Sequence, residues 1–202
     1  NYGGTGGKAE IKFFIRRINM NTYTLNKKKV MAKAITAIAA TAASVALPQV
    51  FHLIGVLSAT GAAAGTVFLP MHIPVLLAGL LAGPWVGLIA GLLSPILSFA
   101  ISGMPVLALL PAMTVELAVY GLVAGLMSKT KLPAAVQLTA AMIGGRLARA
   151  LAVLVSVNLI GGEGSVIGVW DATVAGLPGI ALQLVIIPLL IYRLKGLKKL
   201  NE

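Results

Sequence analysis

The sequence contains no cysteine, only five acidic residues and only 10% charged residues in all. The absence of cysteine excludes disulfide bonds, thiolate metal sites and cysteine nucleophiles, and five carboxylates leave little room for a carboxylate-rich metalloenzyme. A soluble domain carries about a quarter charged residues, whereas this chain of 202 residues is 58% hydrophobic, with a mean hydropathy of +0.98. These figures indicate an integral membrane protein.

Motifs of nucleotide binding and catalysis are also missing. The chain has no glycine-rich loop ending in Gly-Lys-Ser/Thr, no Gly-x-Ser-x-Gly and no aspartate cluster suited to metal-assisted phosphotransfer. Its two histidines, His52 and His72, lack the cysteines or the helical His-Glu pattern of a metal site. We therefore expect a protein that is not an enzyme and holds no cofactor, and that relies on another chain if ATP drives it.

The apolar stretch from Val30 to Tyr192 is long enough for about six membrane-spanning helices of about 20 residues each. The predicted fold is an all-α integral membrane protein, a six-transmembrane-helix bundle. Residues 61–66 are expected to be too small and flexible to hold a helix alone, and residues 161–171 to form the longest polar connection. The predicted spans are 31–53, 67–83, 85–101, 105–128, 134–160 and 172–192.

The net charge of +11 gathers in three clusters, within residues 8–33, at Lys129 and Lys131, and within residues 193–199. Cationic residues that flank apolar segments favour the cytoplasmic side of a membrane. Six spans put all three clusters on that side, with both termini cytoplasmic. A nucleic-acid surface would instead need a basic stripe with polar or aromatic partners on a folded face, so no nucleic acid is expected as a partner.

The N-terminal residues differ in composition from the rest of the chain. Residues 1–26 are expected to form an extension, 27–195 the membrane domain and 196–202 a cytoplasmic tail. The run that begins at Met20 is typical of the opening of a bacterial membrane protein, so one interpretation is that Met20 is the natural start. The alternative is an amphipathic helix on the membrane surface, with the apolar residues Ile11, Phe13, Phe14 and Ile15.

Three ionisable residues are predicted inside the membrane, where charges are costly and therefore usually functional or paired. At 1.5 Å per residue, Glu116 lies roughly 16 Å from the external end of its span, and Arg146 roughly 18 Å from the cytoplasmic end of the next. Because these spans are antiparallel, both residues and Arg149 reach the same depth. One glutamate cannot neutralise two arginines. Either Glu116 and Arg146 form a structural pair while Arg149 reaches polar loop groups, or an anionic ligand binds at least one arginine.

Other polar residues are predicted to converge on the external half of the bundle. For Trp170 the alternative is an ordinary interfacial tryptophan, and His72 has the alternative role of orienting an outer loop. Besides Glu116, Arg146 and Arg149, the candidate substrate-binding residues are His72, Asn158, Trp170 and Gln183, with Glu163 and Asp171 in the last external loop.

Small residues recur at a spacing of four, as in Gly87 with Gly91 and Gly121 with Gly125. This spacing lets helix backbones approach closely, and most of these residues are expected to pack inside the bundle. The alanine-rich face of the first span is the better candidate for docking a partner. It contains Ala32, Ala39, Ala42, Ala43 and Ala46.

From about residue 27 to residue 195 the sequence resembles the substrate-binding (S) components of energy-coupling factor (ECF) vitamin transporters. The resemblance is carried by a set of short motifs that are specific only together. They are Phe68-Leu69-Pro70-Met71-His72-Ile73-Pro74-Val75-Leu76-Leu77-Ala78-Gly79, Gly83-Pro84, Gly87, Gly91-Leu92-Leu93-Ser94-Pro95, Gly103-Met104-Pro105, Glu116-Leu117-Ala118-Val119-Tyr120-Gly121, Gly145-Arg146 and Leu177-Pro178-Gly179-Ile180-Ala181-Leu182-Gln183.

The resemblance implies six membrane helices and a high-affinity vitamin site near the external face of a bacterial plasma membrane, capped by the loop after the first span. It also implies a membrane coupling (T) protein and two cassette ATPases as partners. Ala39 and Ala43 best match the family's docking motif, with Ala42 and Ala46 as the shifted alternative. Two arginines against one glutamate favour an anionic vitamin: pantothenate first, then folate or cobalamin. The competing classes are a solitary structural or channel-like membrane protein without ATPase partners and, less favoured, a membrane enzyme.

Overall fold

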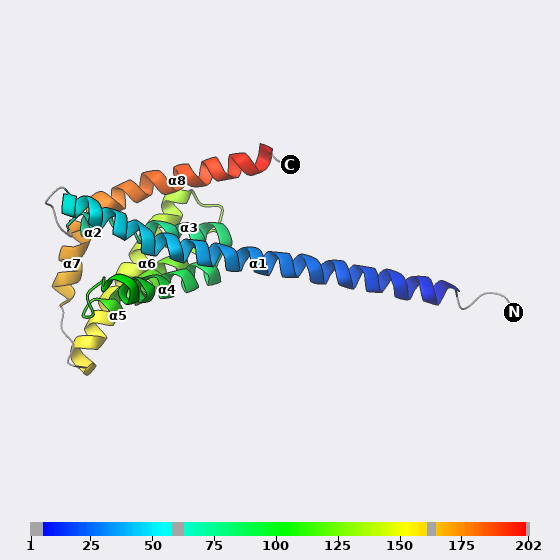
Figure 1. The fold of residues 1–202 in the computed structure, drawn as a ribbon, viewed down its shortest axis with the longest axis horizontal. Helices are drawn as coiled ribbons and strands as arrows, with labels where there is room; N and C mark the ends of the chain where they lie inside the picture. The colour runs from blue at the N-terminus through cyan, green and yellow to red at the C-terminus, as the bar shows by residue number, and fades with distance from the viewer. Residues whose placement is uncertain (1–5, 58–62, 161–164, 201–202) are drawn as a thin grey trace. The chain divides into compact units, whose positions relative to one another are not determined.

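The computed structural model describes residues 6–57, 63–160 and 165–200, and every regular element among them is helical. The predicted all-α class is confirmed. The chain divides into two compact units, Asn1–Ile35 and Thr36–Glu202, and the site lies entirely in the second. The elements are α1 (Gly6–Leu57), α2 (Ala63–Phe68), α3 (His72–Ala82), α4 (Pro84–Ser102), α5 (Leu110–Met127), α6 (Ala134–Val155), the π-helical turn η1 (Ser156–Ile160), α7 (Val166–Ala175) and α8 (Leu177–Leu200) (Figure 1).

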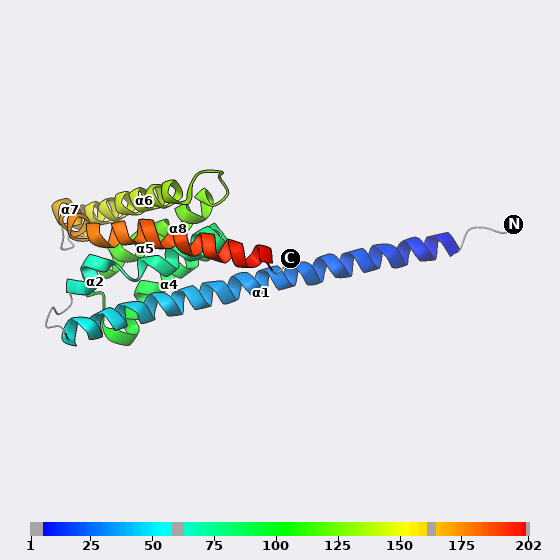
Figure 2. The same ribbon diagram turned by 90° about the horizontal axis from the view of Figure 1, so that it is seen from above.

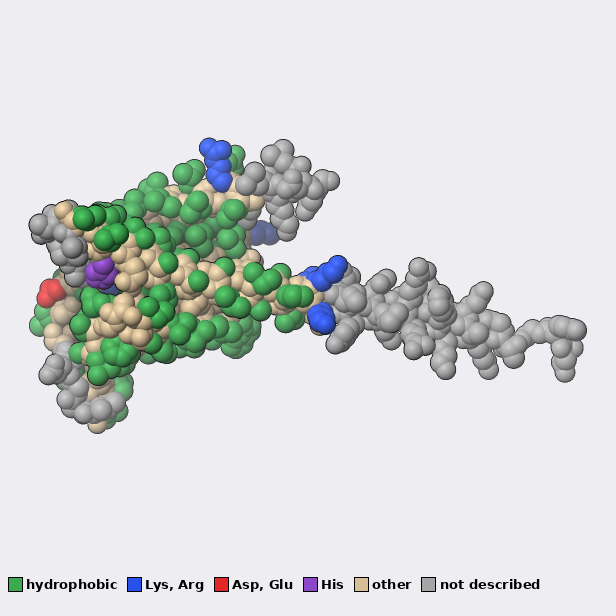
Figure 3. Space-filling model, viewed as in Figure 1, with side chains coloured by type: hydrophobic (Ala, Val, Ile, Leu, Met, Phe, Trp, Pro, Cys, Tyr) green, Lys and Arg blue, Asp and Glu red, His purple; other side chains and the backbone are tan. Residues whose placement is uncertain are grey.

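Five segments of the described chain are long and apolar enough to cross a membrane. Many large apolar side chains are exposed, and Figure 3 shows hydrophobic side chains spread over the visible face of Thr36–Glu202. A surface of this kind is solvated by lipid and not by water. The protein is therefore a multi-pass membrane protein. The five segments are Asn26–Gly55, Pro84–Ser102, Leu110–Met127, Ala134–Leu159 and Leu177–Leu194.

The predicted span 67–83 is not one helix. The chain breaks between α2 and α3, and the 11 residues of α3 reach only about 16 Å, half of a bilayer core. The break has a local cause, because Pro70 has no N–H to donate and Leu69 adopts a positive φ of 49°. The prediction that residues 61–66 cannot hold a helix is also wrong from Ala63 onward, where α2 begins.

Three other boundaries differ from those predicted. The α5 helix begins at Leu110 and not at 105, because a turn led by Gly103, with φ 69°, separates it from α4. The predicted polar connection 161–171 is wrong beyond Ser165, whose hydroxyl caps α7 by accepting a hydrogen bond from the Gly168 N–H at 2.9 Å. A second break at Gly176 starts the last long helix at Leu177 instead of 172.

Glycines set the closest helix contact, between α4 and α5. A Cβ atom on Gly87 would overlap the backbone of Gly121, and one on Gly91 would overlap the carbonyl of Leu117. At the other end of α5, Gly125 lies directly against Pro84. The predicted role of these spaced glycines in packing is confirmed, since only glycine allows the two backbones to approach this closely.

Side-chain contacts give the direction of each helix in Thr36–Glu202. In α1, Ala40 packs against Val86 near the start of α4, and Gln49 hydrogen-bonds to Ser102 at its end (3.0 Å). Ile191, late in α8, clusters with Leu138 early in α6, and Figure 2 shows these two helices next to each other. One end of the bundle therefore carries Gly83, Lys129, Lys131 and Arg193, and we call it the basic end. The opposite end carries the 103–109 loop and α7.

Candidate functional site

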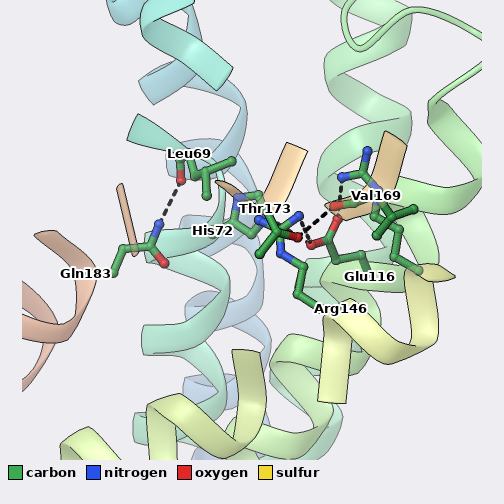
Figure 4. Close-up of polar contacts among 8 residues, drawn as sticks. Leu69, His72, Glu116, Arg146, Val169, Thr173 and Gln183 are labelled. Carbon is green, nitrogen blue, oxygen red and sulfur yellow. Dashed lines mark hydrogen bonds and ion pairs between the residues drawn. The ribbon is translucent and has the colours of Figure 1, made fainter. Parts of the chain in front are cut away.

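A fully buried carboxylate, that of Glu116 on α5, lies between two guanidinium groups of α6 (Figure 4). The Arg146 Nη1 atom is 3.0 Å from Glu116 Oε1, and Arg149 Nη1 donates a hydrogen bond of 2.8 Å to Glu116 Oε2. Residues three apart share one face of a helix, so both arginines project toward α5. Gly145 permits this approach, because a Cβ atom there would overlap the ring of Tyr120.

The cluster carries more positive charge than its single carboxylate neutralises. The two arginine side chains are only 12% and 14% exposed. Among the described residues, Arg146 Nε, Arg146 Nη2 and Arg149 Nε have no hydrogen-bond partner. The alternative in which Arg149 turns toward polar loop groups is wrong, because Arg149 makes the shorter of the two ion pairs. An anion could bind the free guanidinium nitrogens without displacing Glu116.

His72, the first residue of α3, lies beside this cluster. Its side chain is 2% exposed, and its Nε2 atom is 4.0 Å from Glu116 Oε1, beyond hydrogen-bond distance. Neither ring nitrogen has a partner in the described part of the chain, and one face of the ring packs against Tyr120 at a centroid distance of 5.2 Å. The imidazole is therefore a buried polar group that lies near the carboxylate of Glu116 but forms no well-aligned hydrogen bond within the described structure.

A cavity of about 560 Å³ opens next to these residues, on the side away from the basic end. This volume is in the range of small-molecule sites. His72, Arg146 and Arg149 supply part of its wall. Most of the remaining wall is apolar and comes from the α2–α3 break, the 103–109 loop, α5 and α7, with residues that include Leu69, Pro70, Met71, Met104, Pro105, Val106, Leu109, Met113, Ala172 and Ala175.

The other candidates from the sequence take different places. Asp171, which is exposed, lines the cavity. Gln183 is buried but does not line it; its Nε2 atom donates to the Leu69 carbonyl at 3.3 Å and so ties α8 to the α2–α3 break. Asn158, which is exposed, bonds to the carbonyl of Leu154 in its own helix. Trp170 is 68% exposed, and both it and Asn158 lie outside the cavity lining. Glu163 lies outside the described residues.

Sequence reasoning missed Ser98 and the methionines of the cavity wall. Ser98 is 1% exposed and lines the cavity, yet it stands in α4 among serines that mostly bond to their own helix. Met71, Met104 and Met113 come from three separate segments that only the fold brings together. No signal in the sequence distinguishes these residues from ordinary buried ones.

The candidate docking residues lie on α1. Ala39, Ala42 and Ala46 are exposed and Ala43 is half-buried, whereas their neighbour Ala40 packs inside against Ala78, Val86 and Ala90. The alanine face therefore remains open to a partner in the described part of the second unit.

Comparison with known proteins gives one match. No curated protein and no solved structure matches the chain. A family profile described as "ECF transporter, substrate-specific component" matches residues 31–191, which include the whole cavity wall and the Glu116–Arg146–Arg149 cluster. Proteins of this family are transport subunits and not enzymes. The chain therefore belongs to the substrate-specific components of ECF transporters.

Proposed function

We propose that this substrate-specific component captures an anionic vitamin in the 560 Å³ cavity, at the external face of a bacterial plasma membrane. A membrane coupling protein and two cassette ATPases then drive import. The observation that carries the proposal is the surplus charge at the base of the cavity: two guanidiniums share one carboxylate, and three of their nitrogens have no partner in the described chain. A ligand carboxylate would satisfy these donors and compensate the remaining positive charge.

The size and the lining of the cavity rank the candidate vitamins. A volume of 560 Å³ suits a drug-sized ligand and is too small for a corrinoid, which places cobalamin last. The Glu116–Arg146–Arg149 cluster offers surplus positive charge for one carboxylate, and the wall also carries the carboxylate of Asp171, which disfavours a second anionic group. Folate, with two carboxylates, therefore fits less well than pantothenate, with one. Pantothenate remains the first choice.

Arg149→Gln should weaken pantothenate binding about ten- to hundredfold. This factor corresponds to the roughly 1.5–3 kcal/mol of a hydrogen bond to a charged group. The measurement is titration calorimetry on the purified protein, with mass spectrometry of small molecules retained after mild detergent extraction. Lys131→Gln, which removes an exposed positive charge at the basic end, is the matched control and should bind like the wild type. Equal affinity in wild type, Arg149→Gln and Arg146→Gln would contradict the anion site.

The external placement of the cavity depends on a six-crossing topology with both termini cytoplasmic. Its support is the alternation of helix directions: α1, α4 and α6 run away from the basic end and α5 and α8 run toward it, while α2 and α3 together make the second crossing. Lys129, Lys131 and Arg193 then all lie on one side, which the positive-inside rule assigns to the cytoplasm.

Cysteines introduced at Ala108 and Thr130 test this topology, because the chain contains no native cysteine. Both positions are exposed, the first in the loop after α4 and the second in the loop after α5. An impermeant thiol reagent added to intact cells should label Ala108→Cys, and should label Thr130→Cys only after the cells are opened. Labelling of both variants from the same side would exclude the six-crossing arrangement.

A further inference from the structure

Ser98 differs from the serine one turn before it in α4. Ser94 is buried and donates its hydroxyl hydrogen to the Ala90 carbonyl at 2.5 Å. Ser98 is equally buried, at 1% exposure, but its Oγ atom has no hydrogen-bond partner among the described residues. Ser94 does not line the cavity, whereas Ser98 does. Of these two serines of α4, the one with the unused hydroxyl is the one that lines the cavity. Ser44 of α1 is also buried without a hydrogen-bond partner in the described chain, but it does not line the cavity, so the lining position and not the unused hydroxyl alone singles out Ser98.

This difference needs a physical reason, because buried hydroxyl groups are nearly always hydrogen-bonded. Serine and threonine in helices commonly bond to the carbonyl four residues earlier, as Ser102, Thr114 and Thr173 do here. A hydroxyl that forgoes this bond remains available to a ligand.

Ser98 shares this property with His72. The imidazole is also buried, lines the same cavity and has two unpartnered ring nitrogens in the described structure. The cavity wall thus contains two kinds of unused polar group. Arg146 and Arg149 on α6 are charged, whereas His72 on α3 and Ser98 on α4 are able to both donate and accept hydrogen bonds without a formal charge.

Resting on the proposed anion site, we infer that Ser98 is a specificity-determining residue which, with His72, hydrogen-bonds to a hydroxyl or amide group of the bound acid. The substrate class is then a hydroxy- or amido-substituted carboxylic acid. An unsubstituted acid would fill the same space but would leave both groups unpaired, and a site built to bond a hydroxyl discriminates strongly against the analogue that lacks it. The two arginines select for negative charge, and Ser98 with His72 selects among anions.

Three probes separate these two contributions: pantothenate, which has both the carboxylate and the neutral groups, pantothenol, which lacks the carboxylate, and hexanoate, which lacks the neutral groups. Affinities are measured by calorimetry on the full chain in detergent, together with thermal stability. We expect Ser98→Ala to weaken binding of pantothenate and pantothenol by about two- to tenfold, the factor for one neutral hydrogen bond. Binding of hexanoate should be unchanged, and Ser98→Thr should restore the affinity.

Ser94→Ala is the matched control, because it removes a buried hydroxyl from the same helix outside the cavity lining. It should leave all three affinities unchanged. An equal loss for hexanoate in Ser98→Ala would mean that Ser98 only shapes the cavity, and would overturn the inference. Unchanged pantothenate binding in Ser98→Ala, beside weakened binding in Arg149→Gln, would also overturn the inference but leave the proposed function intact. Failure of all three probes to bind the wild type would overturn both.

Discussion

Glu116→Gln should lower the free energy of unfolding by about 3–5 kcal/mol, the cost of breaking a buried ion pair by removing one partner. The substitution keeps the size and shape of the side chain, so little of the loss comes from packing. It removes the one carboxylate that faces both Arg146 and Arg149, whose side chains are 12% and 14% exposed. Two like charges then share a buried site with no counter-ion from the described chain. The measurement is reversible unfolding by denaturant in one detergent.

Two further variants make this result interpretable. Asp171→Asn removes an exposed acid and should change stability by less than about 0.5 kcal/mol, as expected for a surface substitution. Adding Arg149→Gln to Glu116→Gln should recover part of the loss, because residues in one ion-pair network are not additive. A loss below about 1 kcal/mol in Glu116→Gln would show that water or lipid headgroups reach the arginines in place of the carboxylate.

Ala39→Trp should abolish substrate uptake while the isolated protein binds its ligand within a few-fold of the wild-type affinity. Ala39 is exposed on α1, outside the cavity lining, and a small residue at this position lets a partner helix approach closely. An indole would hold such a partner away. Uptake is measured in cells that express the coupling protein and the ATPases, and binding is measured on the purified chain.

Leu151→Trp, a substitution at an apolar side chain of α6 that is 61% exposed, is the control for bulk on the surface and should transport normally. Ala40→Trp should instead unfold the protein, because Ala40 packs against Ala78, Val86 and Ala90. Loss of binding together with uptake in Ala39→Trp would place this alanine face inside the bundle and not at a docking surface.

The parts of the fold that the sequence predicts well are those with a single long apolar run. The predicted spans 85–101 and 134–160 agree with α4 and with α6 and η1 to within a few residues. The sequence predicts 67–83 as one uninterrupted span, whereas the structure breaks it between α2 and α3, because hydropathy does not report where backbone hydrogen bonds end. The break at Leu69 and Pro70 lies inside an apolar run, and non-helical backbone at membrane depth is tolerated only where protein or a cavity surrounds it. Here Gln183 satisfies the Leu69 carbonyl, and the cavity borders Leu69, Pro70 and Met71.

The candidate site is likewise predicted only in part from the sequence. The constant rise of a helix and the rarity of charges in apolar helices predict that Glu116, Arg146 and Arg149 lie at one depth, and the structure brings the three side chains together. The polarity of Asn158 and Trp170 at the external end predicts a role in binding, yet both are exposed and neither lines the cavity. Whether such a side chain lines the cavity depends on how its helix is rotated about its own axis. That rotation is set by packing against neighbouring helices, which a single sequence does not specify.

The glycine contact between α4 and α5 has a mechanical consequence. Where Gly87 meets Gly121, backbone touches backbone, so no side chain between the helices can change rotamer and allow them to slide. Direct backbone contact of this kind favours motion of the two helices together as one rigid body. Other parts of the cavity wall come from the 103–109 loop and the α2–α3 break, which contribute Met104 and Met71 to the lining, and methionine is an unbranched side chain that adapts its shape easily. We therefore expect entry and release of a ligand to move those segments against the α4–α5 pair, which acts as a fixed frame.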